Sequence, residues 1–270
     1  MLIWKNTATL DSYSEGLIFT ETKQEAEIAL LGSKAIRLDE FPNLKGIFRA
    51  GIGADNVPIK EAEAKGILVR FPSRETMGII YEETASFTCG LILRMLYDKV
   101  GNLDNWEKYD RVQLADKVLL VIGIGNIGGR VEKKMKELLN VKTYDVLKNS
   151  VMELENLIST SDCITLHIPK SEENSHFMNK EKLSLMKNGA ILINTARGAI
   201  VDEEALYAEI ESGRIHAAFD VFWQEPYQGP LKKYHPERFF MTPHVASTCN
   251  GFLEGCRESL DSLIKEISHV

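Results

Sequence analysis

Cysteine is scarce in this chain, and the few residues present do not have the spacing of a metal site. The 270 residues include four cysteines, and no two of them form a C-x-x-C pair. The six histidines form no H-x-x-x-H pattern either. We therefore expect no metal site. We expect buried free thiols in a reducing compartment at Cys89, Cys163, Cys249 and Cys256.

Long apolar runs and a leader-like start are also missing. Residues 84–97, the longest apolar stretch, include Arg94 and are too few to cross a bilayer. The first five residues lack the basic segment and the long apolar segment of a signal peptide. We expect a protein that does not enter a membrane and that resides in the cytoplasm.

Positive charge is in deficit. The chain has 32 basic residues against 39 acidic ones, which gives a formal net charge of −7. This balance argues against a general nucleic-acid-binding surface. The remaining composition, 44% hydrophobic and 26% charged, is that of a globular protein whose core needs no disulfide or metal.

Chemically useful residues follow five short apolar runs that are typical of strands. These residues are Gly123, Asp145, Arg197, Asp220 and His244. In an open α/β sheet, ligands bind outside the carboxyl ends of the parallel strands. If the five runs are neighbours in one sheet, the residues face one crevice, and the pattern indicates a nucleotide-using enzyme.

The order of elements predicts the fold class. Residues 1–75 contain short strand-like and helix-like pieces, and residues 76–97 form a long helix with little polar surface. A helix that is apolar nearly all round is usually buried or shared between domains. After a polar stretch, strands and helices alternate to about residue 248, which indicates a parallel sheet covered on both faces. We expect an α/β protein with a smaller α/β domain at residues 1–80 and a Rossmann-type, doubly wound domain at residues 81–248.

A glycine-rich turn lies between a strand-like run and a helix in the larger domain. Gly123, Gly125 and Gly128 fit the pattern G-x-G-x-x-G. In that pattern the first glycine permits a tight turn, the second lets the backbone approach a pyrophosphate, and the third lets the helix pack on the strand. The phosphate then lies at the helix N-terminus. The apolar face predicted for this helix consists of Ile127, Val131, Met135 and Leu138.

Asp145 ends the next strand-like run after the glycine turn. A carboxylate at this point accepts hydrogen bonds from the adenosine ribose and repels a 2′-phosphate. The predicted cofactor is therefore NAD rather than NADP. A tight turn with an incidental aspartate is the alternative reading of these residues.

Three residues are candidates for catalysis. The planar guanidinium of Arg197 matches a carboxylate, and the imidazole of His244 can carry the proton of an alcohol–carbonyl interconversion. A carboxylate such as Glu225 orients an imidazole and favours its protonated form. Taken singly, each residue also has a structural interpretation. Arg197 fits a surface salt bridge, Glu225 fits a loop residue before proline, and His244 fits a packed histidine. Their places in three successive strand-end loops favour a joint site. His167 also ends a strand, but without a visible partner, so we interpret it as packed.

Together these motifs resemble those of the D-isomer-specific 2-hydroxyacid dehydrogenases over nearly the full length of the chain. The matching segments are the glycine turn with Asp145 and residues 49–57, 166–169, 193–198, 219–226 and 242–247. Residues 49–57 and 84–90 are most similar to 3-phosphoglycerate dehydrogenases.

The resemblance implies a role for each motif. Arg197 would hold the substrate carboxylate or carbonyl, His244 would be the acid and base, and Glu225 would be its partner. The substrate would also contact the backbone of Gly51, Ile52 and Gly53. The NAD site would be lined by Gly123, Gly125, Asn126, Ile127, Gly128, Asp145, Thr195, Ala196 and Asp220. The resemblance further implies a flavodoxin-like first domain joined by residues 249–270, and a homodimer formed mainly through the nucleotide domain.

Two features depart from the family pattern. The first domain is short, and the loop at residues 32–35 reads Gly-Ser-Lys-Ala where the family often carries an arginine. A phosphate would find at most Lys34 there, a point charge in place of a fork-shaped donor. Phosphorylated and unphosphorylated acids both remain open as substrates. We also expect no regulatory domain after residue 270, and therefore no serine feedback of the kind that some relatives show.

The leading prediction is hydride transfer between nicotinamide and a small D-2-hydroxy acid or 2-oxo acid. Formate oxidation is supported by the same fold, but those relatives pair the histidine with glutamine, so Glu225 argues against it. An NAD-sensing binding protein, like the corepressors of the family, can keep all three catalytic residues and show little turnover. A turnover test on purified protein separates these readings.

Overall fold

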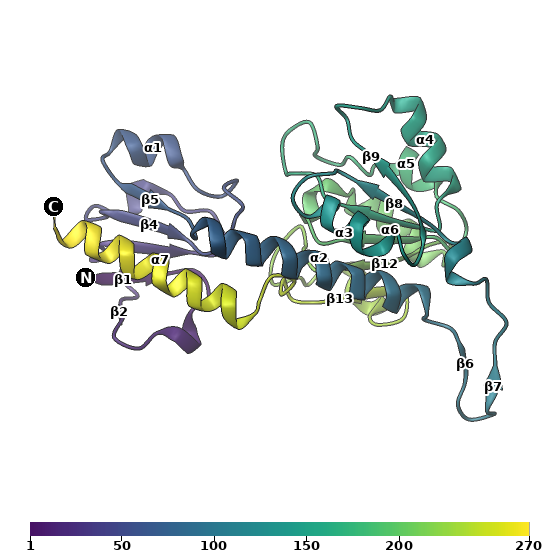
Figure 1. Cartoon of the computed structure of the whole chain (residues 1–270). Coiled ribbons are helices and arrows are strands. Elements are labelled where there is room, and N and C mark those ends of the chain that lie inside the picture. The colour runs from purple at the N-terminus through teal and green to yellow at the C-terminus, as the bar shows by residue number, and fades with distance from the viewer. Residues whose placement is uncertain (270) are drawn as a thin grey trace. The chain divides into compact units, whose positions relative to one another are not determined.

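A computed structural model describes residues 1–269 of the chain (Figure 1). Its internal contacts divide it into two compact units. The first unit combines Met1–Ile80 with the C-terminal segment from Ser247, and the second is Tyr81–Ala246. Each unit has its own parallel sheet covered by helices, so the predicted α/β fold class is confirmed.

The first unit contains a five-stranded parallel sheet in the order β2-β1-β3-β4-β5, which is the flavodoxin-like order. The connections that precede β2 and β4 hold only single 3₁₀ turns, which explains why this domain is short. Its elements are β1 (Leu2–Lys5), η1 (Asp11–Tyr13), β2 (Ile18–Phe19), β3 (Ile28–Leu31), η2 (Leu38–Glu40), β4 (Gly46–Arg49), α1 (Ile59–Ala64), β5 (Leu68–Arg70) and α7 (Asn250–Ser268).

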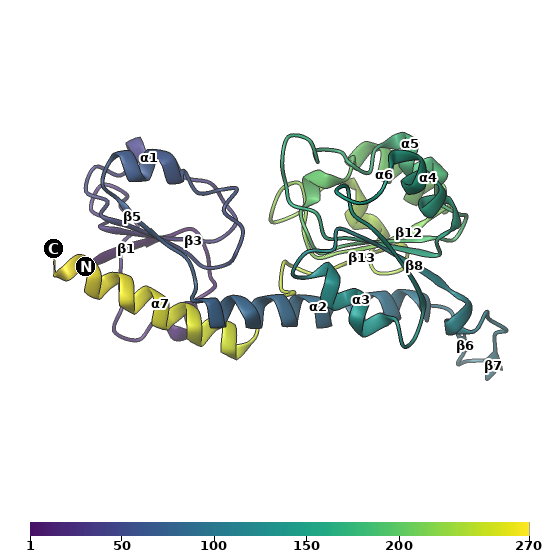
Figure 2. The ribbon, with the colours of Figure 1, turned by 45° about the horizontal axis from the view of Figure 1, so that its top comes forward.

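The C-terminal helix α7 packs on the sheet of the first unit (Figures 1 and 2). Its buried residues recur at helical spacing and therefore form one apolar stripe. A side chain on Gly46 at the start of β4 would come within 2.6 Å of Ile267, so the helix depends on this glycine to approach the strand. The return of the C-terminal helix to the first domain is thus observed. The stripe consists of Phe252, Cys256, Leu260, Leu263 and Ile267.

The second unit contains a six-stranded parallel sheet in the order β13-β12-β11-β10-β8-β9. The long helix α2 begins in the first unit and continues into the second. The elements are α2 (Arg74–Leu96), β6 (Gly101–Asn102), β7 (Glu107–Lys108), η3 (Leu114–Asp116), β8 (Val118–Ile122), α3 (Gly128–Met135), β9 (Asn140–Tyr144), α4 (Val151–Thr160), β10 (Cys163–Leu166), α5 (Lys180–Leu185), β11 (Ile191–Asn194), η4 (Gly198–Ile200), α6 (Glu203–Glu211), β12 (His216–Phe219), η5 (Pro230–Tyr234) and β13 (Phe239–Met241).

Helices cover both faces of this second sheet. Residues of α2 and α3 pack on one face, and residues of α4, α5 and α6 pack on the other. Both faces of β10 and β11 are therefore buried, as their continuous apolar runs predicted. The chain passes from β8 outward to β9 and then returns to β10 on the other side of β8. Such a reversal of strand order creates the crevice in which α/β proteins bind ligands.

Two details of the sequence prediction are wrong. Helix α3 ends at Met135, and Leu138 lies beyond it with 43% of its surface exposed. The neighbouring Leu139 is buried in its place, because the chain turns out of the helix before position 138 and the helical period no longer applies. Cys249 is only half-buried, because it stands at the start of α7, whereas the other three cysteines are buried free thiols.

The polar stretch that follows α2 forms a small antiparallel hairpin, β6–β7, which pairs with neither sheet. Figures 1 and 2 both show it extending away from the sheet of the second unit. Leu103 and Trp106 at its tip each expose 79% of their surface.

Among the helices of residues 1–269, none is both long enough and apolar enough to span a bilayer.

Candidate active site

The glycine turn between β8 and α3 has the geometry of a dinucleotide loop. Gly123 adopts a φ of +92°, and a side chain there would lie 2.6 Å from the His167 carbonyl oxygen. A side chain on Gly128 would collide with the Gly123 carbonyl at 1.9 Å. By contrast, a side chain on Gly125 would meet no protein atom within 4 Å, so the backbone is open to solvent there. Closed packing at two glycines and open space at the third fit a pyrophosphate at the start of α3.

Asp145 lies at the end of β9, beside this turn. The last residues of β8 and β9, Ile122 and Tyr144, are register partners, so the two strand ends are adjacent. The Asp145 Oδ1 atom accepts the Leu147 N–H at 2.9 Å, and its backbone N–H donates to Asn149 Oδ1 at 3.0 Å. The carboxylate therefore sits in a fixed turn next to the phosphate loop, where a ribose hydroxyl could donate to it. Within the glycine turn, Asn126 is exposed and Ile127 occupies the N-cap position of α3.

Arg197 extends from a tight turn after β11. The side chain of Asn194, the last residue of β11, is fully buried and bridges this turn. Its Nδ2 donates to the Arg197 carbonyl at 2.9 Å, and its Oδ1 accepts the Ala196 N–H at 3.0 Å. A side chain on Gly198 would lie 2.1 Å from the Phe222 backbone, so the next loop closes the other side. The turn that carries Thr195, Ala196 and Arg197 is thus held on both sides.

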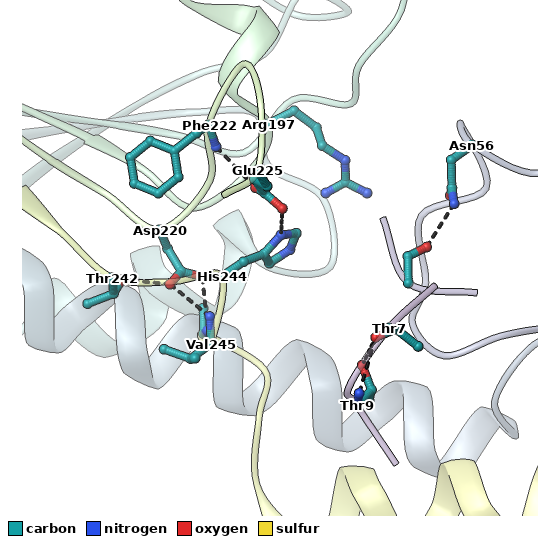
Figure 3. Close-up of polar contacts among 12 residues, drawn as sticks. Thr7, Thr9, Asn56, Arg197, Asp220, Phe222, Glu225, Thr242, His244 and Val245 are labelled. Carbon is teal, nitrogen blue, oxygen red and sulfur yellow. Dashed lines mark hydrogen bonds and ion pairs between the residues drawn. The ribbon is translucent and has the colours of Figure 1, made fainter. Parts of the chain in front are cut away.

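Glu225 and His244 form a hydrogen-bonded pair between the loops that follow β12 and β13. His244 Nδ1 lies 2.9 Å from Glu225 Oε2, and both side chains are partly buried. The Phe222 N–H donates to Glu225 Oε1 at 3.2 Å, so the carboxylate is anchored in its own loop. Because Nδ1 faces the carboxylate, Nε2 is the ring nitrogen that does not take part in this pair. Figure 3 shows Arg197, Glu225 and His244 with their functional groups turned toward the same space.

Asp220 binds the loop that carries His244. Its fully buried carboxylate accepts the Thr242 hydroxyl at 2.6 Å and the Val245 backbone N–H at 2.9 Å (Figure 3). It also accepts the Ala246 backbone N–H at 2.9 Å. Burial raises the pKa of this carboxyl above its ordinary value, and the three donors act in the opposite direction. His244 has a φ of +55°, a conformation that costs a residue with a side chain about 1–3 kcal/mol. The hydrogen bonds to Asp220 on both sides of His244 hold it there.

In the first unit, the predicted substrate residues lie at the carboxyl ends of β3 and β4. Gly51 has a φ of +143°, and a side chain there would come 2.5 Å from the Arg49 guanidinium. That guanidinium is buried, and its Nε donates to the Gly53 carbonyl at 3.1 Å and to Asn56 Oδ1 at 3.2 Å. Ile52 lies between the two glycines and is partly exposed.

Asn56 also fixes the neighbouring loop at residues 32–34. Its Nδ2 donates to the Gly32 carbonyl at 2.8 Å and to the Lys34 carbonyl at 3.0 Å. Asn6, just after β1, donates to the same Lys34 carbonyl at 3.0 Å. The Lys34 side chain is exposed. A network of polar side chains, in which Arg49 and Asn56 are buried, therefore gives both loops defined backbones. The sequence did not identify Asn6 or Asn56 as part of it.

His167 is not part of either cluster. Desolvation lowers its pKa to about 3, so the ring is uncharged near neutral pH. Its Nε2 lies 3.0 Å from the Thr165 hydroxyl. The packed reading of this residue agrees with that geometry. Asn194 is a further residue whose role the sequence did not reveal, and its signal was an amide at the end of a run that is otherwise Ile-Leu-Ile.

Comparisons with known proteins bear on this arrangement. The family model described as "D-isomer specific 2-hydroxyacid dehydrogenase, NAD binding domain" matches residues 94–246. The hydroxypyruvate reductase of Thermotoga maritima is 36% identical over 243 residues, which cover 83% of this chain and 78% of the relative. The glyoxylate reductase of Thermofilum pendens is 34% identical, with coverage of 86% and 75%. The D-3-phosphoglycerate dehydrogenase of Archaeoglobus fulgidus is 32% identical, but the chain spans only 46% of it.

A solved structure supports the same assignment. The D-lactate dehydrogenase from Aquifex aeolicus, complexed with NAD and lactic acid, superposes with a TM-score of 0.78 and is 25% identical. The match covers 100% of this chain and 96% of that structure. The sequence identities to the curated relatives, the matched family model and the Rossmann-type sheet agree. The chain belongs to the D-isomer-specific 2-hydroxyacid dehydrogenases, and it is an NAD-dependent enzyme of that family.

Proposed function

We propose that this protein reduces a small, unphosphorylated 2-oxo acid with NADH to the D-2-hydroxy acid. Arg197, Glu225 and His244 carry the reaction. The observation that supports this most strongly is the 2.9 Å contact between His244 Nδ1 and Glu225 Oε2, with the Arg197 guanidinium turned toward the same space (Figure 3). A carboxylate–imidazole pair beside a carboxylate-binding cation suits the interconversion of an alcohol and a carbonyl.

Each of the three side chains has one task in this reaction. The Arg197 fork binds the substrate carboxylate through charge-assisted hydrogen bonds. The imidazolium of His244 donates the proton on Nε2 to the carbonyl oxygen, and the Glu225 carboxylate stabilises that imidazolium through Nδ1. In the reverse direction, neutral His244 removes the hydroxyl proton through Nε2. When bound, the cofactor supplies or accepts the hydride.

The two units divide the remaining tasks. The second unit is the NAD-binding domain, with the glycine turn at the pyrophosphate, Asp145 at the adenosine ribose, and Thr195 and Ala196 beside Arg197. Asp220 acts on the site by holding the His244 loop. The first unit is the substrate domain, where the backbone of Gly51, Ile52 and Gly53 binds the substrate.

The loop after β3 supports an unphosphorylated substrate. Lys34 is the only cation at residues 32–35, and a lysine offers a phosphate a point charge rather than a planar set of donors. The next arginine along the chain, Arg37, is paired with Asp39. Two of the relatives compared above carry the names of hydroxypyruvate and glyoxylate reductases, which agrees with a small substrate.

A panel of substrates and both cofactors tests this function. With purified protein, we expect NADH oxidation with glyoxylate or hydroxypyruvate, at a kcat/KM at least about tenfold above that for phosphohydroxypyruvate. We expect NADPH to be used at least about tenfold less well than NADH, because Asp145 would face its 2′-phosphate. A preference for NADPH would contradict the role of Asp145, and a preference for the phosphorylated acid would contradict the role given to the loop at residues 32–35.

We also propose that the protein is a homodimer joined through the β6–β7 hairpin, and that it acts in the cytoplasm. A two-stranded hairpin alone is marginally stable in water, and this one exposes Leu103 and Trp106 at its tip. The charged residues of the hairpin are Asp104, Glu107 and Lys108, so its formal net charge is small and repulsion between two copies would be weak. The free cysteines agree with a reducing compartment.

Replacing both tip residues, Leu103→Ser with Trp106→Ser, is expected to convert the dimer into a monomer, because the apolar surface that two copies would bury is removed. Sedimentation velocity at micromolar concentration measures the change. The matched control is Met152→Ser on α4, which removes an 80% exposed side chain from another surface of the same unit and should leave the dimer intact. A monomeric wild type, or a dimeric double variant, would contradict this interface.

A further inference from the structure

Two buried threonine hydroxyl groups connect the turn that carries Arg197 to helix α2. The Thr195 hydroxyl is 2.8 Å from the hydroxyl of Thr88, which belongs to helix α2 and is 107 residues earlier in the chain. Thr88 is fully buried and Thr195 is 7% exposed. The Thr88 hydroxyl is also 2.7 Å from the Thr84 carbonyl, one helical turn back on α2. Neither Thr84 nor Thr88 has a part in the proposed function.

The number of protons fixes the direction of these bonds. A threonine hydroxyl has one proton to donate and two lone pairs with which to accept. A carbonyl can only accept, so Thr88 donates its proton to Thr84. Thr195 must then be the donor to Thr88. The Thr195 hydroxyl is thus tied in one orientation by an acceptor on a different element of the fold.

Two other contacts hold the same turn, so the bond between Thr195 and Thr88 affects the position of Arg197. The Asn194 amide joins the Ala196 N–H to the Arg197 carbonyl, so residues 194–197 are linked as one turn. Gly198 fits against the Phe222 backbone and leaves no room for displacement on that side. The bond from Thr195 to Thr88 ties the near end of the same turn to α2. The base of the Arg197 side chain is therefore fixed at three points.

We propose that Thr88 is a positioning residue for Arg197, acting through the Thr195 hydroxyl. This inference rests on the proposed role of Arg197 in binding the substrate carboxylate. Without the Thr88 oxygen, the Thr195 hydroxyl has lost its acceptor in a buried place, and a buried donor seeks another partner. Rotation or displacement of Thr195 would then shift the turn, and small displacements of a binding group carry large kinetic effects.

The central test replaces the hydroxyl without changing the shape of the side chain. Thr88→Val is expected to lower kcat/KM for hydroxypyruvate roughly five- to fifty-fold, mainly by raising KM. NADH affinity, measured by fluorescence titration, should fall by a smaller factor than kcat/KM, no more than about threefold, because Thr195 is one residue of the proposed NAD site while the phosphate loop and Asp145 are untouched. Thr88→Ser restores the hydroxyl and should return kcat/KM to within about threefold of the wild type. Thr84→Val, one turn earlier on the same helix, is the matched control, because Thr84 enters the chain of bonds through its backbone carbonyl.

A double-mutant cycle separates positioning from a general loss of stability. If Thr88 acts through Thr195, then Thr88→Val should add less than about a twofold effect in a Thr195→Val background. Independent, multiplying effects would overturn the proposal. So would a Thr88→Val variant that melts at a lower temperature but keeps the wild-type KM, or a Thr84→Val control that loses as much activity.

A binding measurement without turnover and a substitute variant complete the test of Thr88. Binding of oxamate, a non-reducible analogue of a 2-oxo acid, to the protein–NADH complex reports on Arg197 without turnover, and Thr88→Val should weaken it by a similar factor. If Thr88→Val does not fold, Thr88→Ala takes its place in both assays. Unchanged oxamate binding in the Thr88 variant, together with weakened binding in Arg197→Ala, would overturn the role of Thr88 alone. Unchanged binding in Arg197→Ala would overturn the proposed function of Arg197 instead.

Discussion

His244→Ala is expected to lower kcat about 10²- to 10⁴-fold in both directions, which is the usual contribution of a positioned acid or base. Reduction needs a proton at the carbonyl oxygen, and oxidation needs a base for the hydroxyl proton. Within the site, Nε2 of His244 is the atom left for both, because Nδ1 faces Glu225 at 2.9 Å. NADH affinity should stay within about threefold of the wild type, since the phosphate loop and Asp145 are on other strand ends. Steady-state kinetics in both directions and a fluorescence titration measure these quantities.

Glu225→Gln is the matched variant for this experiment. It keeps an oxygen that can accept the His244 Nδ1–H, but it removes the negative charge that stabilises the imidazolium. A charge-assisted hydrogen bond contributes about 1.5–3 kcal/mol, so the expected loss of reductive kcat is roughly tenfold to a few hundredfold. A His244→Ala variant that turns over within a few-fold of the wild type would show that another group transfers the proton. A Glu225→Gln variant with unchanged kinetics would remove Glu225 from the pair.

Arg197→Ala has the second large expected effect. The loss of charge-assisted hydrogen bonds to the substrate carboxylate should cost about 1.5–3 kcal/mol. In kcat/KM this is roughly tenfold to a few hundredfold, mostly through a higher KM. NADH binding should be little changed, because Arg197 is not among the residues of the phosphate loop. Comparison of substrate kinetics and NADH affinity for the same preparation checks this division.

Arg197→Lys serves as the control for charge. Lysine keeps the positive charge but loses the planar fork of donors, so it should restore only part of the activity. Full activity in Arg197→Lys would mean that Arg197 acts as a point charge. Loss of NADH affinity in Arg197→Ala, with intact substrate kinetics, would mean that the residue belongs to the cofactor site instead.

Much of the fold could be predicted because it depends on local patterns. The central strands β8, β10 and β11 of the second unit read as continuous apolar runs, since inner parallel strands are buried on both faces. The alternation of strands and helices then fixes a doubly wound sheet. The five residues chosen at the ends of these runs do follow β8, β9, β11, β12 and β13, all in one parallel sheet. Because these strands are parallel neighbours, the five residues lie at the same edge of the sheet, and this can be inferred without knowing any side-chain contact.

The supporting residues could not be predicted, because their partners are distant in sequence. Asp220 was expected to line the NAD site, and its place at the end of β12 suggested no more than that. The structure shows its carboxylate bound to donors 22 to 26 residues away, at Thr242, Val245 and Ala246. The contact between Thr88 and Thr195 crosses 107 residues. No periodicity encodes such pairs, since they depend on how α2 packs on the sheet.

The hairpin after α2 was also not predicted. Its strands, β6 and β7, are two residues each, which is too short for an alternating pattern to be recognised. Its composition reads as a polar loop, although Leu103 and Trp106 are exposed at its tip. In the first unit, loop geometry depends on Asn6 and Asn56, whose amides bind backbone carbonyls of another loop. A sequence pattern does not show which carbonyl an amide will reach.

The most direct test of the account is the reduction of hydroxypyruvate by the purified wild-type protein with NADH, followed by analysis of the configuration of the product. We predict stoichiometric oxidation of NADH, because the proposed site supplies a proton from His244 and a cation at Arg197 for the substrate carboxylate. We predict D-glycerate as the product, because the chain belongs to a D-isomer-specific family. Tight binding of NADH with no consumption of hydroxypyruvate, glyoxylate or any other 2-oxo acid of the panel would contradict the account, and would instead support an NAD-sensing binding protein.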